Sequence, residues 1–132
     1  MQQFVRALIQ DNEGKFLIVK KRKIGENVWN LPGGVLADGE IESESLRRIL
    51  KEEFNLDTAY QKEIYSGIFL FRTGQREISF WMCHAKNLGT LRPKLGLYDA
   101  PQFVDLQDIS DKKIQTDIPV EAVKALVKLY LE

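Results

Sequence analysis

The most constraining feature of this chain is the segment over residues 32–56, in which a glycine-rich turn leads into an amphipathic helix. Pro32-Gly33-Gly34 and Asp38-Gly39 are turn sequences, which let the backbone approach a phosphate or expose a carbonyl to a metal. Apolar periodicity then predicts a helix over residues 41–54. Its core-facing stripe, at positions i, i+4 and i+8, is formed by Leu46, Leu50 and Phe54.

A second face of this helix carries adjoining carboxylates. At about 100° per residue, positions 49, 52 and 53 fall within about 60° of one another, so Glu52 and Glu53 share a face with Ile49. Mg²⁺ prefers oxygen ligands and usually shares its shell between a few carboxylates, waters and substrate phosphates. The pattern therefore indicates a metal-binding face, with an ordinary acidic amphipathic helix as the alternative interpretation.

Written out, residues 33–56 read GGVLADGEIESESLRRILKEEFNL. This segment resembles the Nudix box, whose pattern is Gly, five residues, Glu, seven residues, then Arg-Glu-aliphatic-any-Glu-Glu-any-Gly-aliphatic. Ile49 replaces the first Glu of the second half, and Asn55 replaces the Gly. The matching residues are Gly34, Glu40, Arg48, Leu50, Glu52, Glu53 and Leu56.

The resemblance implies an α/β fold, the Nudix-type α/β/α sandwich with a mixed β-sheet between helices. Strands interrupted by two helices, the first of them after a glycine-rich loop, favour the same arrangement. Residues 29–34 and 103–106 also resemble family segments, and the length of 132 residues fits a single Nudix domain over residues 1–132.

The elements follow from apolar runs and the turn residues between them. Asp11-Asn12-Glu13-Gly14 predicts a hairpin between the first two strands. We expect strands over residues 4–10, 16–21, 31–36, 60–72, 77–86 and 102–105, and further helices over residues 107–110 and from Pro119 onward.

For function, the resemblance implies Mg²⁺-dependent hydrolysis of a nucleoside triphosphate or another nucleoside diphosphate-linked substrate, with Mn²⁺ as an alternative ion. It implies catalytic roles for Glu40, Arg48, Glu52 and Glu53. The metal would be bound by Gly34, Glu52 and Glu53.

Ile49 leaves the activity open. In one interpretation Glu52, Glu53 and a carboxylate from elsewhere sustain a reduced activity, and Asp99 is the nearest candidate, although it also suits a turn before Pro101. In another, Ile49 extends the apolar stripe and the domain is catalytically idle, binding a nucleotide or a protein. A third makes the chain a purely structural subunit. Asn55 is a milder departure, because Asn tolerates the left-handed conformation that ends a helix.

Four residues are candidates for substrate binding, each with a simpler alternative. Lys20 and Lys21 occupy the strand end where the family places a basic residue near the phosphates, but exposed lysines are common there. Asp117 precedes the last helix, where the family reads a base edge, and it also suits a helix N-cap. Arg76 could contact a nucleotide or be solvated.

Composition narrows the partners. Lys plus Arg and Asp plus Glu balance at 19 each, so net charge indicates neither a nucleic-acid polymer nor an anionic membrane. A small-molecule nucleotide is the expected partner of a monomer or homodimer. With no leader and no long apolar run, we expect a cytoplasmic protein. Cys83 is the only cysteine, which excludes an internal disulfide.

Overall fold

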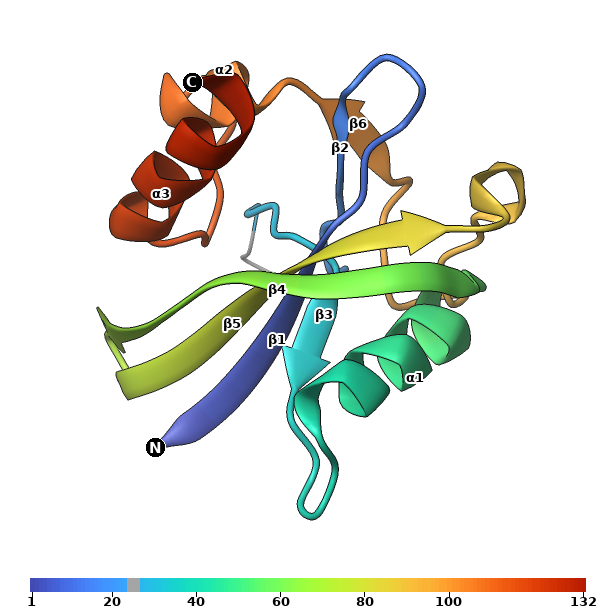
Figure 1. Cartoon of the computed structure of the whole chain (residues 1–132), viewed down its shortest axis with the longest axis horizontal. Coiled ribbons are helices and arrows are strands. Elements are labelled where there is room, and N and C mark those ends of the chain that lie inside the picture. The colour runs from blue at the N-terminus through green and yellow to red at the C-terminus, as the bar shows by residue number, and fades with distance from the viewer. Residues whose placement is uncertain (24–26) are drawn as a thin grey trace.

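A computed structural model describes residues 1–23 and 27–132. A four-stranded sheet lies between two helices, with α1 (Glu42–Phe54) on one face and α3 (Val120–Leu131) on the other (Figure 1). This arrangement confirms the predicted α/β/α sandwich. No helix in the described part of the chain is long and apolar enough to span a membrane.

The four-stranded sheet is mixed, in the order β3-β1-β5-β4. Strand β1 (Gln2–Leu8) runs parallel to β5 (Gly74–Ala85) and antiparallel to β3 (Gly33–Val35). The long strand β4 (Thr58–Phe71) pairs antiparallel with β5 and forms one edge. The glycine-rich segment forms the short strand β3, which pairs with β1 and leads into α1.

A second sheet joins β2 (Phe16–Ile18) to β6 (Gln102–Val104), antiparallel. The predicted hairpin is therefore only partly correct: Leu17 N donates to Ile9 O over 2.9 Å, but β2 takes β6 as its main partner. A reason is that β2 is buried on both faces, which requires cover from a distant segment. The remaining elements are a 3₁₀ turn (Leu88–Thr90), α2 (Leu106–Ser110) and α3.

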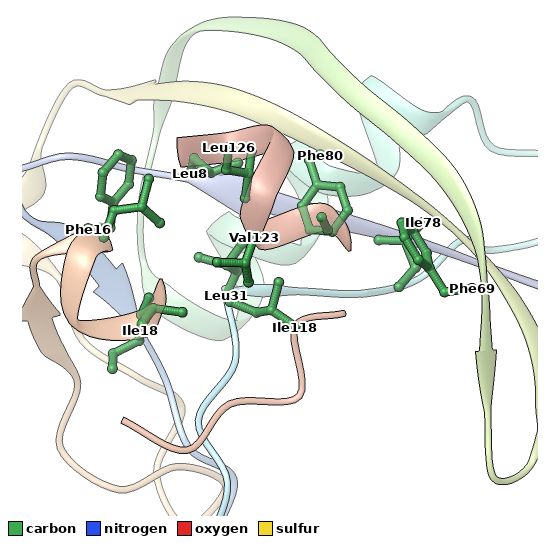
Figure 2. Close-up of a cluster of buried hydrophobic side chains, with 13 residues drawn as sticks. Leu8, Phe16, Ile18, Leu31, Phe69, Ile78, Phe80, Ile118, Val123 and Leu126 are labelled. Atoms are coloured by element: carbon green, nitrogen blue, oxygen red, sulfur yellow. The ribbon is translucent and has the colours of Figure 1, made fainter. Parts of the chain in front are cut away.

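Alternation along β1 divides the core in two. Val5 and Ala7 face α1, while Phe4, Arg6 and Leu8 face α3, as the period of two in a strand requires. Figure 2 shows the cluster on the α3 side, whose largest members include Phe16, Phe80 and Leu126. The cluster on the α1 side contains the predicted stripe of Leu46, Leu50 and Phe54 together with Ile49.

Helix α1 ends as its sequence predicts. Asn55 adopts the left-handed conformation, with φ of 57°, and its N–H donates to Lys51 O over 3.1 Å. Leu56 N also donates, to Leu50 O over 3.1 Å, and the Leu56 side chain is buried. The substitution of the box glycine by Asn55 therefore leaves the end of the helix intact.

Candidate functional site

Arg48 connects two of the box carboxylates. Its Nε lies 3.1 Å from Glu40 Oε2, in the loop before α1, and an NH1–Oε2 distance of 3.2 Å joins it to Glu52, one turn further along. The hydrogen bond to Glu40 raises the pKa of Arg48. Partly exposed pairs of this kind add little stability, so the contribution of Arg48 is to orient the two carboxylates.

Glu53 is held from a different part of the chain. The Tyr98 hydroxyl donates a hydrogen bond to Glu53 Oε1, and the Tyr98 ring packs against Phe54 with centroids 4.8 Å apart. Burial raises the pKa of Tyr98, and the bond to Glu53 raises it further, so the phenol stays protonated and remains a donor. Tyr98 thereby fixes the position of the Glu53 carboxylate.

Ile49 is part of the core. It is 3% exposed and packs in the same cluster as Leu46 and Leu50. Its Cδ1 atom lies 3.4 Å from the place where Gly34 would carry a Cβ, so the isoleucine fills the space beneath the glycine turn. The interpretation of Ile49 as an extension of the apolar stripe agrees with this packing.

The donor set fits a metal only in combination with a substrate. Glu52 is exposed and Glu53 half-buried on adjoining positions of α1, but residues 1–23 and 27–132 contain no group of three acidic, histidine or cysteine side chains suited to a metal. Mg²⁺ is commonly bound by one or two carboxylates plus substrate phosphates. Glu52 and Glu53 therefore meet this requirement only where a substrate supplies phosphate oxygens.

Asp99 is engaged elsewhere. Its Oδ1 lies 3.1 Å from Arg22 Nε, and its Oδ2 lies 3.3 Å from Lys20 Nζ. Lys20 Nζ also donates to Asn27 Oδ1 over 2.8 Å. The structure therefore brings Asp99 to the end of β2, where it pairs with two cations, and it does not group Asp99 with Glu52 and Glu53.

A pocket of about 270 Å³ opens beside these residues. Tyr98 and Gly33 belong to its wall, so the pocket adjoins both Glu53 and the glycine turn. Its charged lining consists of Arg6, Lys21, Lys23, Arg76 and Asp117. An excess of cations over carboxylates makes this pocket, which we call the cationic pocket, suited to an anionic ligand.

A cavity of about 670 Å³ between α2 and α3 is larger, but it is lined by apolar side chains such as Ile109 and Ile118 and by Lys112 and Lys124. It has no carboxylate in its lining and does not adjoin the box. We therefore place the candidate site at the smaller, cationic pocket.

The pocket gathers three of the four predicted substrate-binding residues, Lys21, Arg76 and Asp117, while Lys20 lies outside its lining. Asp117 does not cap α3, whose N-cap position is Pro119 and whose start has no side-chain cap bond. Arg76 is not simply solvated, since its Cζ lies 4.3 Å from the ring centroid of Phe71.

Arg6, Lys23 and Tyr98 are among the pocket residues that the sequence did not identify. Arg6 carried a signal, because it is a charge inside an apolar strand and on the same face as Leu8. Tyr98 carried none, because it lies in a loop and its partner Glu53 is 45 positions away.

A mixed sheet between two helices, with an acidic helix beside a cationic pocket, is the architecture of a Nudix-type protein. The chain belongs to this family: the model of the NUDIX domain matches residues 2–124. Members of the family are typically pyrophosphohydrolases that use divalent metals.

Solved structures show the same fold. The ORF135 protein of E. coli is 21% identical with a TM-score of 0.74, over 98% of this chain and 90% of that one. A C. elegans Ap4A hydrolase is 15% identical with a TM-score of 0.75, over 98% and 97%. A NUDIX hydrolase from Nitrosomonas europaea is 15% identical with a TM-score of 0.77, over 98% and 90%. Among curated proteins no sequence matches.

Proposed function

We propose that residues 1–132 act as one Nudix domain that hydrolyses a small nucleoside triphosphate or another nucleoside diphosphate-linked substrate. The observation that carries this proposal is the position of Tyr98, which lines the cationic pocket and hydrogen-bonds to Glu53. A nucleotide in the pocket therefore lies next to the carboxylates of α1. Water attack on a phosphorus atom requires such proximity.

In this proposal the substrate and the protein share the metal. Glu52, Glu53 and the backbone of Gly34 would hold Mg²⁺ or Mn²⁺, and the substrate phosphates would complete the shell. The bound ion would neutralise phosphate charge and make a water more acidic. Arg48 orients Glu40 and Glu52, and Tyr98 does the same for Glu53.

The basic residues divide into two roles. Lys21 and Arg76 line the pocket and contact the substrate directly, and Asp117 accepts hydrogen bonds from it. Lys20 does not line the pocket. Asp99 and Asn27 hold its side chain near the end of β2. Asp99 can serve as a metal ligand only by leaving Lys20 and Arg22, so we assign it to positioning these cations.

Turnover of a nucleotide panel tests the proposal. We expect hydrolysis of at least one nucleoside triphosphate or diphosphate-linked compound with Mg²⁺ or Mn²⁺, and a loss of 100-fold or more in Glu53→Gln, because removing a metal-binding carboxylate costs transition-state stabilisation on the order of 3 kcal/mol. Glu44→Gln, an exposed change on the first turn of the same helix, is the matched control. Hydrolysis that is equal in both variants contradicts the assignment, and absence of hydrolysis across the panel refutes the activity.

One observation favours a second candidate, a domain that binds a nucleotide without hydrolysing it. The burial of Ile49 removes a carboxylate from the face of α1 that carries Glu52 and Glu53. In this case the Ile49→Glu variant should gain turnover over the wild type while nucleotide affinity stays within threefold. Wild-type turnover equal to that of the variant would exclude the idle domain.

A further inference from the structure

Two arginines meet around one aromatic ring in the cationic pocket. The Cζ atom of Arg6 lies 5.7 Å from the ring centroid of Phe4, and that of Arg76 lies 4.9 Å from the same centroid. Arg76 also stacks on Phe71 at 4.3 Å. Cation–π contacts fix both guanidinium groups. We call Arg6 and Arg76 the arginine pair.

Neither member of the pair has a carboxylate partner. Within the described residues, the only hydrogen bond of Arg6 runs from NH1 to Leu31 O, over 3.1 Å, and neither arginine forms an ion pair. Arg76 donates to Thr73 Oγ1 over 3.2 Å, while its Nε is buried without a partner. Buried charges in proteins are normally paired, so these donors are available to a ligand.

Arg6 has charged neighbours at both ends of the site, Glu53 at one end and Asp117 at the other. Burial lowers the pKa of Arg6 to about 10, while the carboxylates of Asp117 and Glu53 raise it and the Arg76 guanidinium lowers it. Arg6 thus lies within electrostatic reach of the carboxylate that adjoins the reaction site and of the acid before α3. A ligand that extends from Glu53 into the pocket passes the arginine pair.

The charge at this end of the pocket is not balanced. Two guanidinium groups face one carboxylate, that of Asp117, which leaves one positive charge in excess. A neutral base edge satisfies hydrogen-bond donors but leaves this charge without a partner. An anionic oxygen group does both, because guanidinium groups bind phosphate and carboxylate through paired hydrogen bonds.

We propose that the arginine pair binds an anionic oxygen group carried by the nucleoside part of the substrate. The preferred substrates are then diphosphate-linked nucleotides with a second anion, a phosphate on the ribose or a carboxylate on the base. This inference rests on the proposed function for the position of the diphosphate, which lies at the Glu53 end, near Lys21. The arginine pair is thus a specificity determinant and takes no part in bond cleavage.

Two matched sets of ligands test the proposal by calorimetric binding. Adenosine 5′-diphosphate and adenosine 3′,5′- and 2′,5′-bisphosphate carry the same groups in different places, and they probe a ribose phosphate. Uridine 5′-phosphate and orotidine 5′-phosphate differ by one carboxylate on the base. We expect at least one anion-bearing ligand to bind tenfold or more tightly than its partner. Arg6→Gln should abolish that preference.

The control variant is Arg72→Gln, an exposed arginine at the turn end of β4, which should keep the preference. Arg76→Gln provides a second variant of the pair, and thermal unfolding verifies that each variant is folded. The absence of any preference or of any binding in the wild type overturns the proposal, and so does a preference that survives in both Arg6→Gln and Arg76→Gln.

The two proposals fail in different ways. Hydrolysis of the nucleotide panel without any preference for a second anion leaves the hydrolase intact and removes this inference. A preference that depends on Arg6 in a protein without turnover leaves the binding site intact and removes the hydrolase.

Discussion

Ile49 Cδ1 lies 3.4 Å from the position that a Cβ on Gly34 would occupy, so an apolar side chain fills the space beneath the glycine turn where the box pattern has a carboxylate. A hydrophobic cluster covers each face of the sheet, and Ile49 belongs to the cluster between the sheet and α1. The residue at position 49 therefore affects both the stability of the domain and the charge of its site.

Ile49→Glu should lower the free energy of unfolding by about 2–4 kcal/mol in the absence of metal, because it places a carboxylate in a core position that is 3% exposed. Urea denaturation measures the effect. Ile49→Gln, similar in size but uncharged, separates loss of packing from charge. Mg²⁺ with a nucleotide should raise the stability of Ile49→Glu more than that of Ile49→Gln, and equal recovery in both variants would contradict a carboxylate aimed at the metal.

Gly33→Ala should destabilise the domain by roughly 3 kcal/mol or more, because a Cβ on Gly33 would overlap the carbonyl oxygen of Val5 on the neighbouring strand. Its φ of 153° adds strain. Gly39→Ala is the matched control: φ is 79° there, but nothing lies within 4 Å of the added Cβ, so we expect about 1 kcal/mol. Denaturation curves that show equal losses would mean that β1 and β3 separate at little cost.

The sequence predicted the elements that local patterns determine. The stripe of Leu46, Leu50 and Phe54 and the end of the helix at Asn55 follow from spacing and conformational preference within one segment. The pairing of β2 with β6, by contrast, joins positions far apart in the chain. No local pattern reports such a contact, so the hairpin signal predicted the turn at residues 11–14 but not the main partner of β2.

The site shows the same division. Spacing identified Glu52 and Glu53, because both lie on one helix. The hydrogen bond from Tyr98 to Glu53 and the pairing of Asp99 with Arg22 depend on how distant loops fold back, 45 and 77 positions away. The sequence could therefore name the carboxylates of α1 and Arg48, but not Tyr98, which holds Glu53, or Arg22, which pairs with Asp99.

Stability should fall as pH rises above about 9, because burial raises the pKa of Cys83 from 9.0 to about 12. The unfolded chain loses this proton first, so the stabilisation is complete below pH 9 and is lost as pH rises towards 12, by up to about 1.4 kcal/mol per unit. Urea denaturation between about pH 8 and 9.5 measures the slope, in a range where the tyrosines of the unfolded chain, with a pKa of about 10, are still mostly protonated. Cys83→Ala should be less stable throughout but show a flatter slope, and an unchanged slope would assign the effect to other groups.

Mg²⁺ alone should bind weakly, with a Kd of about 1 mM or higher, because Glu52 and Glu53 offer two adjoining carboxylates and the described residues group no third acidic, histidine or cysteine side chain with them. A nonhydrolysable nucleotide supplies phosphate oxygens, so Mg²⁺ affinity should rise at least tenfold in its presence, and by linkage the nucleotide should bind at least tenfold more tightly with Mg²⁺. Calorimetric titrations in both orders measure this coupling, and Glu53→Gln should abolish it while Glu44→Gln preserves it. Tight binding of Mg²⁺ to the protein without a nucleotide would show instead that the chain completes a metal site by itself, with Asp99 released from Lys20 and Arg22 as the first ligand to test.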